Sequence, residues 1–379
     1  MCKKRKILFI SSWYPTHLEP NNGNFVQRHA EAVSLLHNVE VLHAIGDFNL
    51  KSNYLIESKE INGIKTVIVF YKNTNNPVVN FYRRMKAYSI GFKKVIFPDL
   101  VHANVLHNNL FFVVYLQKKF KIPFVVTEHW TALQKESHHK TSIVILKTAK
   151  FIGNQARFIL PVSNNLKQSL VLLGIKTPMK LVSNVVDTEV FNFKEIVGHS
   201  KDFKFLHISS LIPRKNPDKI IKAVHRLRIE GFPVQLNIGG DGDEVALQSL
   251  IKELRAESYI SVFGTLTYNQ VAEKMQQSDC FVLFSDNETQ GCVILESYAC
   301  GKPVIATMVG GVPEFVSPEK GILIEPHDEE GLYKAMKEMI KIRTQYSPNV
   351  LREFVVDKHS QESICRQFTK IYDQVLEGN

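Results

Sequence analysis

The sequence predicts an α/β protein built from two Rossmann-like domains, each with a parallel sheet. Short apolar segments of strand-like composition alternate with amphipathic helical segments in two successive rounds, which is the pattern of parallel sheets covered by helices. The chain has 379 residues, enough for about two domains of ordinary size. Its 44% apolar and 22% charged residues are typical of a soluble globular protein.

Twelve short apolar segments are the strand candidates. Those of the first half lie at Lys6–Ser11, Val39–His43, Thr66–Phe70, Leu100–Ala103, Pro123–Thr127 and Phe158–Val162. Those of the second half lie at Phe205–Ser209, Val234–Gly239, Ile260–Phe263, Cys280–Phe284, Pro303–Ala306 and Gly321–Ile324. We place the domain boundary near residue 190, where the chain passes into the polar stretch 193–202, so the expected domains are 1–190 and 191–360.

The N-terminal segment and the cysteines favour a protein of the reducing cytoplasm. The segment MCKKRKILFISSWYP is interpreted as a first buried strand and not as a signal peptide, because its apolar run is short and ends at Ser11 and Ser12. No segment approaches the roughly 18 apolar residues that a membrane-spanning helix needs. The five cysteines show no metal-ligand spacing, and an odd number argues against a disulfide framework.

Charge divides the chain into two unlike halves. Residues 1–190 carry 25 basic and 11 acidic side chains, a net charge of +14, whereas the remainder carries 22 and 26, a net charge of −4. A basic domain can bind nucleic acid or an anionic membrane surface. Because the cations are spread over many elements without a nucleic-acid-reading motif, we do not expect nucleic acid as a partner.

The segment FYRRMKAYSIGFKKVIF, residues 81–97, holds the densest positive charge and predicts an amphipathic helix. Its apolar stripe comprises Phe81, Met85, Tyr88, Phe92, Val95 and Ile96, and the cations off the stripe are Arg83, Arg84, Lys86, Lys93 and Lys94. Such a helix can lie at an anionic membrane surface, or it can pack its stripe on the domain's own sheet. The two alternatives are compatible where the cations stay exposed.

Two carboxylates, Glu288 and Glu296, are separated by seven residues and flank the start of a helix. Glu288 lies in the loop after the strand Cys280–Phe284, and Glu296 lies on the helix itself. Ligands of parallel α/β sheets bind at the carboxyl ends of the strands, so both acids are expected at a binding site. Carboxylates accept hydrogen bonds from sugar or ribose hydroxyls. The backbone N–H groups of the helix start favour an anion such as a diphosphate, and they belong to Gly291, Cys292 and Val293.

The run 288–314 resembles the signature of glycosyltransferase family 4. After the two acids come ACGKPV (299–304) and GGVPE (310–314), which match the family's Ala-x-Gly-x-Pro-Val and Gly-Gly-x-Pro-Glu segments. The resemblance implies a GT-B fold, in which two Rossmann-like domains face each other across a cleft. It also implies sugar transfer with retention, from a nucleoside-diphosphate sugar to a hydroxyl, and a C-terminal helix, 361–379, that packs back on the first domain.

The same resemblance assigns phosphate contacts to two further loops. The segment SSLIPRKN resembles the family's Gly-Arg-Leu-x-x-x-Lys-Gly loop, which makes Lys215 the expected cation for the departing diphosphate. Ser210 stands where the family has Arg, and either Arg214 or a group of the first domain could compensate; a solvated loop lysine is the alternative at 215. Gly23 and Asn24 precede the first helix where the family often has two glycines, and a plain turn with an asparagine cap is the alternative there.

Three further segments bear on the donor site. Phe263 and Gly264 resemble the family's Phe-x-Gly segment, whose backbone lies against the nucleobase. The turn Gly239–Asp243 lacks the spacing of a dinucleotide loop and is expected to be structural. His129, in TEHW, matches Thr-x-His, which implies an imidazole that hydrogen-bonds the donor sugar; a structural histidine is the alternative. Since Glu128 qualifies as a nucleophile only by standing beside His129, a front-side substitution is favoured.

The sequence predicts no bound metal, and it leaves three functions open. The pair His138-His139 has no third ligand at metal spacing. A glycosyltransferase would use a nucleotide-sugar donor and a glycan or lipid-linked acceptor, in surface polysaccharide or glycolipid assembly, at the inner face of an anionic membrane. A nucleotide-sugar epimerase of the same fold would isomerise the sugar without an acceptor. A non-catalytic nucleotide-sugar-binding protein, which Ser210 and the single Gly23 motivate, would bind the donor without turnover.

Overall fold

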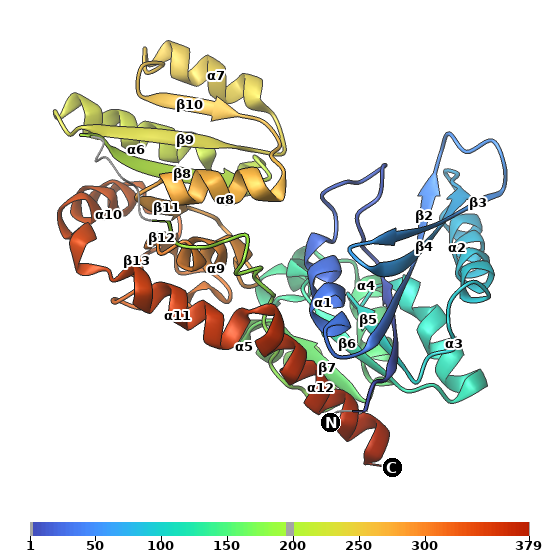
Figure 1. Ribbon diagram of the computed structural model, residues 1–379. Coiled ribbons are helices and arrows are strands. Elements are labelled where there is room, and N and C mark those ends of the chain that lie inside the picture. The colour runs from blue at the N-terminus through green and yellow to red at the C-terminus, as the bar shows by residue number, and fades with distance from the viewer. Residues whose placement is uncertain (1–2, 195–200, 379) are drawn as a thin grey trace. The chain divides into compact units, whose positions relative to one another are not determined.

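The computed structural model describes residues 3–194 and 201–378, and the chain divides into two compact units. Unit 1 comprises Met1–Val185 and Gln361–Asn379, and unit 2 comprises Val186–Ser360. Each unit has its own sheet (Figure 1). Each also has its own buried apolar side chains. The polar stretch 193–202, at which the domain boundary was expected, lies partly outside the described residues.

Unit 1 contains a seven-stranded sheet with the strand order β3-β4-β2-β1-β5-β6-β7. Neighbouring strands are parallel except for β3 and β4. The strands are β1 (Lys6–Ser11), β2 (Asn38–Asp47), β3 (Tyr54–Ile61), β4 (Ile64–Lys72), β5 (Leu100–Asn104), β6 (Phe124–Glu128) and β7 (Phe158–Pro161). The six strand candidates of the first half are confirmed, with shifts at their ends.

The expectation of a purely parallel sheet is wrong at one edge of unit 1. Strand β3 pairs antiparallel with β4 through a two-residue turn, Asn62-Gly63, whose φ angles of 49° and 76° are those of a type I′ hairpin. Few residues of β3 are even partly buried, so it lacks the alternation that marks a half-buried strand. The Asn-Gly pair between two runs of strand-forming residues was the signal that could have found it.

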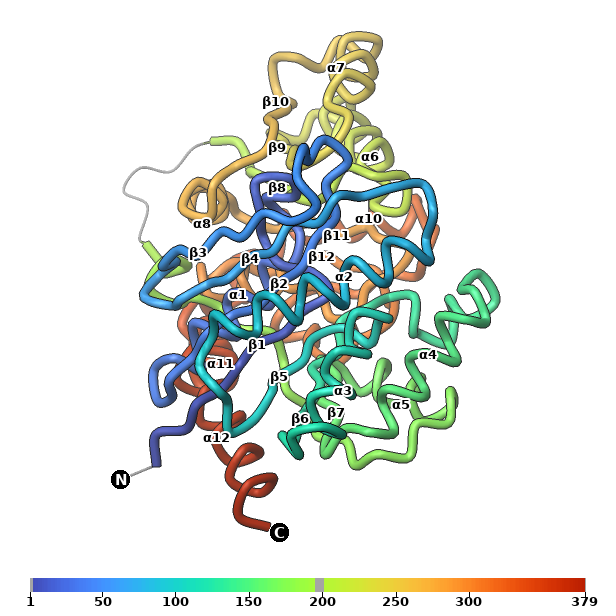
Figure 2. The backbone as a smooth tube through the Cα atoms, turned by 90° about the vertical axis from the view of Figure 1, so that its right-hand side faces the viewer, coloured from blue at the N-terminus to red at the C-terminus, as the bar shows by residue number. Residues whose placement is uncertain are grey.

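Helices cover both faces of the unit 1 sheet, because alternate strand residues point to opposite sides. Leu8 and Ile10 face one layer of helices (Figure 2). This layer consists of α2 (Pro77–Phe92), α3 (Phe111–Phe120), α4 (Ile143–Gly153) and α5 (Asn164–Leu172). Ile7 and Phe9 face the other layer, which contains α1 (Asn24–Ser34) and α12 (Gln361–Glu377). The C-terminal helix α12 therefore packs against α1 within unit 1.

Helix α2 is the amphipathic helix expected at 81–97, and it begins and ends earlier than that range. Tyr88 and Gly91 are buried, and a Cβ atom at Gly91 would collide with Leu42 of β2 and crowd Val69 of β4. The stripe thus packs on the domain's own sheet, which is the second of the two alternatives. In the described part of the chain, no helix is both long enough and apolar enough to cross a bilayer.

Unit 2 contains a six-stranded parallel sheet with the order β10-β9-β8-β11-β12-β13. Its strands are β8 (Phe203–Ser209), β9 (Val234–Gly240), β10 (Ile260–Phe263), β11 (Cys280–Leu283), β12 (Val304–Thr307) and β13 (Gly321–Ile324). Its helices are α6 (Pro217–Ile229), α7 (Glu244–Glu253), α8 (Tyr268–Gln277), α9 (Cys292–Ala299), α10 (Glu329–Ile342) and α11 (Pro348–His359). The six strand candidates of the second half are confirmed.

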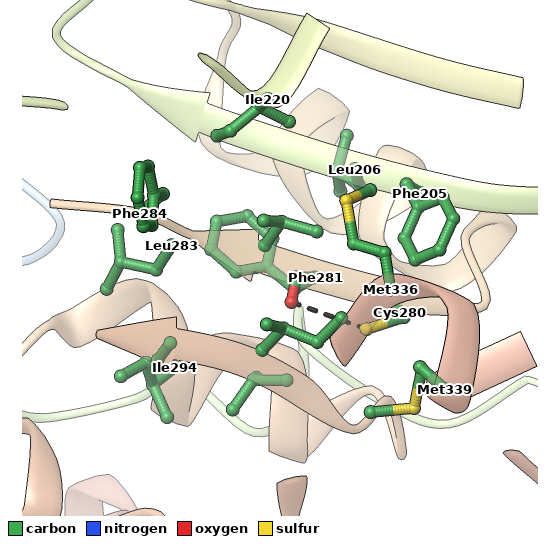
Figure 3. Close-up of a cluster of buried hydrophobic side chains, with 14 of the residues drawn as sticks. Phe205, Leu206, Ile220, Cys280, Phe281, Leu283, Phe284, Ile294, Met336 and Met339 are labelled. Atoms are coloured by element: carbon green, nitrogen blue, oxygen red, sulfur yellow. Dashed lines mark hydrogen bonds between the residues drawn. The ribbon is translucent and has the colours of Figure 1, made fainter. Parts of the chain in front are cut away.

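The core of unit 2 is densest around β11. Figure 3 shows Phe281 and Leu283 of this strand among Ile220 of α6, Ile294 of α9 and Met336 of α10, all of them buried. Because β11 is held from several sides, the loop that follows it starts from a fixed point. That loop carries Glu288.

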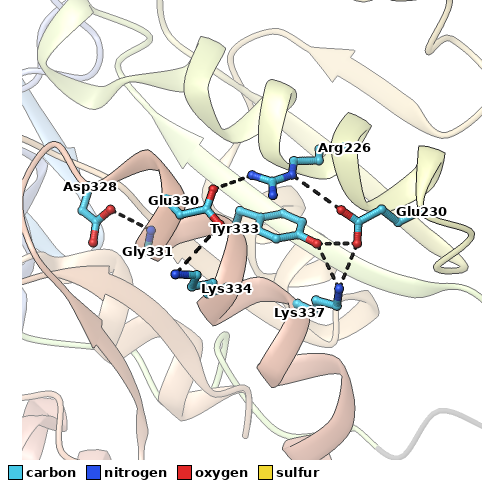
Figure 4. Close-up of polar contacts among 8 residues, drawn as sticks. All are labelled: Arg226, Glu230, Asp328, Glu330, Gly331, Tyr333, Lys334 and Lys337. Atoms are coloured by element: carbon cyan, nitrogen blue, oxygen red, sulfur yellow. Dashed lines mark hydrogen bonds and ion pairs between the residues drawn. The ribbon is translucent and has the colours of Figure 1, made fainter.

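A polar network joins α6 to α10 at the surface of unit 2 (Figure 4). The guanidinium carbon of Arg226 lies 3.6 Å from the centre of the Tyr333 ring, and Glu230 accepts hydrogen bonds from Tyr333 and from Lys337, the latter at 2.8 Å. These groups are substantially exposed, and exposed ion pairs contribute little to stability. We assign the network to helix packing.

Candidate active site

Three helices that follow β1, β8 and β11 begin without a side-chain cap. Among the described residues, the N-caps of α1, α6 and α9 are Gly23, Asn216 and Gly291, with φ of 80°, 49° and 79°, and none gives a side-chain hydrogen bond to the first turn. Helix α3 also has no side-chain cap, but it directly continues a 3-10 turn through Leu110. Helices α2, α4, α5, α7, α8, α10 and α11 do have such caps, from Asn, Ser, Thr or Asp. A helix start without a capping side chain leaves room for an anionic ligand.

Lys215 and Glu288 form an ion pair between the loops after β8 and β11. These strands are parallel neighbours, so their carboxyl ends bring the two loops together. Only 12% of the Lys215 side chain and 11% of the Glu288 side chain are exposed. The structure therefore joins the residue expected to face the diphosphate with the residue expected to face the sugar.

Hydrogen bonds from Arg214 and Asn216, the neighbours of Lys215, also join the loop of Lys215 to the loop of Glu288. Asn216 donates hydrogen bonds to the Phe284 carbonyl oxygen at 3.1 Å and to Asp286 at 2.6 Å. Arg214 donates to the Asn287 carbonyl oxygen at 3.1 Å. Arg214 thus contacts the loop of Glu288, whereas Ser210, which stands at the family's arginine position, is exposed.

Glu296 lies on α9 and is 5% exposed. Its carboxylate is close enough to Cys300, one turn later, to add to the effect of burial, which raises the pKa of that thiol to about 12. Gly291 is buried ahead of the helix, and the first two helical residues, Cys292 and Val293, are partly buried. The expected helix start and both acids are therefore on one loop-helix segment.

The remaining residues predicted in unit 2 lie on the other side of β8. Phe263 ends β10 and Gly264 follows it, and β9 and β8 separate that strand from β11. The ammonium of Lys274 lies 5.2 Å from the centre of the Phe263 ring. In the glycine-rich turn after β9, the Asp241 N–H donates to the Ser209 carbonyl oxygen at 3.2 Å, which is a structural contact.

Sequence reasoning missed His207, in the middle of β8. Its ring nitrogens lie 2.8 Å from the Val282 carbonyl oxygen and 2.8 Å from the Ser209 hydroxyl. Burial is the main cause that lowers the pKa of His207 to about 4; the hydrogen bond with Val282 opposes it, and the nearby Lys215 acts in the same direction as burial. The neutral ring links β8 to β11 near the carboxyl ends of these strands, where the two loops begin. A histidine within an otherwise apolar strand was the available signal.

In unit 1, the loop after β1 passes close to Gly23. A Cβ atom at Gly23 would lie 2.5 Å from the carbonyl carbon and oxygen of Trp13, and its φ of 80° also disfavours other residues. Asn24 is the first residue of α1. The single glycine is thus required by its backbone neighbours, and the plain asparagine cap considered as an alternative does not occur, since Gly23 is the N-cap.

His129 directly follows β6 and is 7% exposed. Its ring centre lies 4.2 Å from that of Phe25 and 5.4 Å from that of His29, both on α1. Burial holds the pKa of His129 well below 6.5, and the nearby His29 and His102 act in the same direction. His129 is therefore a neutral imidazole, able to exchange hydrogen bonds with hydroxyl groups.

No cluster of three or more His, Cys, Asp or Glu side chains that could hold a metal ion occurs among residues 3–194 and 201–378. His138, one of the two adjacent loop histidines, lies with one ring nitrogen 2.9 Å from the Leu133 carbonyl oxygen. Turnover without a metal stays a prediction.

Comparison with known protein families agrees with this geometry. Residues 23–190 match the family described as Glycosyltransferase Family 4, and residues 190–353 match the family described as Glycosyl transferases group 1. The chain belongs to glycosyltransferase family 4. The resemblance carried by residues 288–314 is thereby confirmed, and with it the assignment as a glycosyltransferase of a family whose members are retaining.

Two curated proteins show what this family 4 glycosyltransferase is similar to in sequence. It is 29% identical over 257 residues to N-acetyl-alpha-D-glucosaminyl L-malate synthase from Bacillus anthracis, with 63% of this chain and 67% of that protein aligned. It is 26% identical over 248 residues to the phosphatidylinositol N-acetylglucosaminyltransferase gpi3 subunit from Schizosaccharomyces pombe, with 63% and 53% aligned. The aligned part thus spans about half of the yeast protein.

Solved structures show the fold of the glycosyltransferase. HepE from Anabaena, solved in complex with UDP and glucose, matches it with a TM-score of 0.76 at 20% identity, over 97% of this chain and 99% of that chain. The GT-B fold that the resemblance implied is thus confirmed.

Proposed function

We propose that this family 4 glycosyltransferase transfers N-acetylglucosamine from UDP-N-acetylglucosamine to a hydroxyl of an anionic acceptor, with retention at the anomeric carbon. The observation that carries the proposal is the largely buried ion pair between Lys215, on the loop after β8, and Glu288, on the loop that leads into α9. A cation and an uncapped helix start suit a diphosphate, and a carboxylate suits hydroxyl groups.

The donor is inferred from the relatives. Both aligned relatives are named for N-acetylglucosaminyl products or transfer, and HepE was solved with UDP. In the proposed complex Lys215 and the start of α9 bind the diphosphate, Glu288 orients the sugar and Glu296 binds the ribose. Arg214, beside Lys215, supplies the second cation in place of the family's arginine, since it contacts the loop that carries Glu288. His129 is the group of unit 1 assigned to a sugar hydroxyl.

The acceptor is inferred from charge. Residues 1–190 carry a net charge of +14. The names of the relatives include L-malate and phosphatidylinositol, two anionic molecules that carry hydroxyl groups. A lipid-linked acceptor of this kind would place the enzyme in glycolipid or surface polysaccharide assembly.

The proposed step is a front-side substitution. The bond between the anomeric carbon and the diphosphate oxygen breaks while the acceptor oxygen bonds to the same face, and the acceptor proton passes to the leaving diphosphate. Lys215 and the α9 start stabilise the growing negative charge, so no metal is required. Glu128 is a poor nucleophile because its carboxylate is fully buried and accepts three backbone hydrogen bonds.

Peripheral contact with anionic lipid is part of the proposal, in the cytoplasm at the inner face of the membrane. Arg83 and Arg84 of α2 are engaged inside unit 1, since Arg83 donates to the Lys72 carbonyl oxygen at 2.6 Å and Arg84 to the Tyr71 hydroxyl at 2.9 Å. The exposed cations of the segment are Lys86, Lys93 and Lys94, and these are the proposed lipid contacts.

The proposal is tested by incubating the protein with UDP-N-acetylglucosamine and either L-malate or phosphatidylinositol vesicles. We expect UDP release that depends on an acceptor, and a product whose anomeric coupling in NMR spectra is that of the α-linked donor. A β-linked product contradicts retention. An isomerised sugar formed without acceptor identifies an epimerase, and donor binding without turnover on either acceptor favours the non-catalytic alternative.

A further inference from the structure

The turn after β5 holds a strained residue. Val105 is buried and has a φ of 65°, in the left-handed region that a β-branched residue rarely adopts. Its N–H donates to the Thr127 carbonyl oxygen at 3.0 Å, and its carbonyl oxygen accepts from the Ser12 hydroxyl at 3.2 Å and from the His107 N–H at 2.7 Å. Such strain persists only where the surroundings fix the turn.

Glu128, the last residue of β6, provides a further constraint. Its carboxylate is fully buried and accepts from the Leu106 N–H at 2.6 Å through one oxygen. Through the other oxygen it accepts from the His129 N–H at 2.8 Å and from the Trp130 N–H at 2.7 Å. One carboxylate therefore ties the strained turn after β5 to the segment after β6. Burial raises the pKa of Glu128 to about 7, against the opposing effect of these three bonds.

The tied segments carry two rings of an aromatic face, and the loop after β1 carries the third. The Trp130 ring meets Trp13 edge to face, with ring centres 5.7 Å apart, and meets His107 at 5.6 Å. All three rings are partly exposed. The chain has only these two tryptophans, so tryptophan fluorescence reports on this edge alone.

We propose that Glu128 is a positioning residue of the transfer reaction: it holds the turn 105–107 and the segment 129–130 together, so that Trp13, His107 and Trp130 form a fixed face for a polyol ring of the acceptor. The inference rests on the proposed function, because the acceptor is that of the proposed reaction. An indole presents a broad apolar surface with an N–H at its edge, which suits the apolar face of such a ring and its hydroxyls. Glu128 acts through its neighbours, since its carboxylate does not reach the surface.

The test is Glu128→Gln. The amide keeps the shape of the side chain, and its oxygen still accepts from two N–H groups, but its NH₂ group faces the third donor at Leu106. We expect acrylamide to quench tryptophan fluorescence at least twice as strongly as in the wild type. We also expect kcat/KM for phosphatidylinositol to fall at least tenfold, while the Kd for UDP, which unit 2 binds, changes less than twofold.

Glu40→Gln is the matched control. Glu40 lies near the amino end of β2 and also accepts a loop N–H, that of Ile96, at 2.8 Å. We expect it to change stability without changing the quenching or the acceptor kinetics. A merely structural role for Glu128 would make the two variants alike, with losses in proportion to the unfolded fraction, and that result would overturn the proposal.

A measurement on the wild type decides the matter if Glu128→Gln does not fold. In hydrogen–deuterium exchange the amides of Leu106, His129 and Trp130 should be strongly protected, and exchange as fast as that of an open turn contradicts the proposal. If the wild type neither binds UDP nor transfers sugar, the proposed function fails. The quenching and exchange results then still decide whether Glu128 holds this edge.

Discussion

The carboxyl edges of the two sheets differ in charge. In unit 2 the edge holds Lys215 and Glu288 as an ion pair, and Arg214 lies beside Lys215 on the loop after β8. In unit 1 the edge keeps His129 neutral by burial and encloses Glu128 among backbone N–H groups. Charged groups suit a diphosphate, and neutral donors and acceptors suit hydroxyls. The comparison teaches that the two edges suit different kinds of ligand group.

Removing the cation of unit 2 should have the largest effect. We expect Lys215→Ala to lower kcat by about 10²–10³-fold, because a donor aimed at developing negative charge contributes that much. Lys219→Ala is the control, since Lys219 is partly exposed and pairs with Glu329 at 2.6 Å. Steady-state kinetics with UDP-N-acetylglucosamine measure both. Equal losses in the two variants would remove Lys215 from the mechanism.

Substitution of the two acids of unit 2 should change different kinetic and binding constants. Glu288→Gln should lower kcat by about ten- to a hundredfold without weakening UDP binding, because Lys215 loses a competing partner. Glu296→Gln should instead weaken UDP binding by a similar factor, since a ribose contact is common to ground and transition states. Calorimetry with UDP separates them. Weaker UDP binding in Glu288→Gln would show that the roles are assigned wrongly.

The neutral histidines of unit 1 predict acid sensitivity. Burial lowers the pKa of His29 and of His43 to about 4. The unfolded chain therefore binds more protons between pH 4 and 6.5, so stability present above pH 6.5 is lost on acidification, by about 2 kcal/mol per histidine at pH 5. Glu128, with a pKa raised to about 7, acts in the opposite direction.

Urea unfolding at pH 7 and pH 5 measures this loss. His29→Gln should reduce the difference between the two pH values, whereas the control His17→Gln, at an exposed position, should not. Equal free energies of unfolding at both pH values would contradict the neutral state of these rings in the folded protein.

Lipid binding should show the smallest effect. Changing Lys86, Lys93 and Lys94 together to Gln should weaken binding to anionic vesicles by about 1 kcal/mol per lysine, and added salt should have the same effect. Changing Arg83 and Arg84 should lower stability instead, because both donate hydrogen bonds inside unit 1. Vesicle co-sedimentation measures the binding. Equal binding to neutral and anionic vesicles would refute the lipid contact.

Much of the fold could be predicted from the sequence, because parallel strands buried on both faces form short apolar runs that stand out. The ends of α2 could not, since the stripe continues into residues 93–97, beyond the C-terminus of the helix at Phe92. Strand β3 was not predicted because none of its residues is buried, although Asn62-Gly63 marked its turn. Exposure, and not composition, separates the strand that was missed from those that were found.

The individual residues of the candidate site could be predicted from the sequence, but the contacts between them could not. Lys215 and Glu288 lie far apart in the sequence, and only the order β8-β11 in the sheet makes their loops neighbours. The same holds for Glu128, whose partner Leu106 follows a different strand. A sequence shows which side chains can bind a ligand, whereas strand order decides which of them meet.

Calorimetric titration with UDP tests most directly whether the charged edge of unit 2 binds the diphosphate. The account predicts that wild-type protein binds UDP, that Lys215→Ala binds it at least tenfold more weakly, and that Lys219→Ala and Glu128→Gln stay within twofold of the wild type. Binding of UDP by Lys215→Ala with wild-type affinity would contradict the account, as would wild-type protein that gives no heat of binding with UDP.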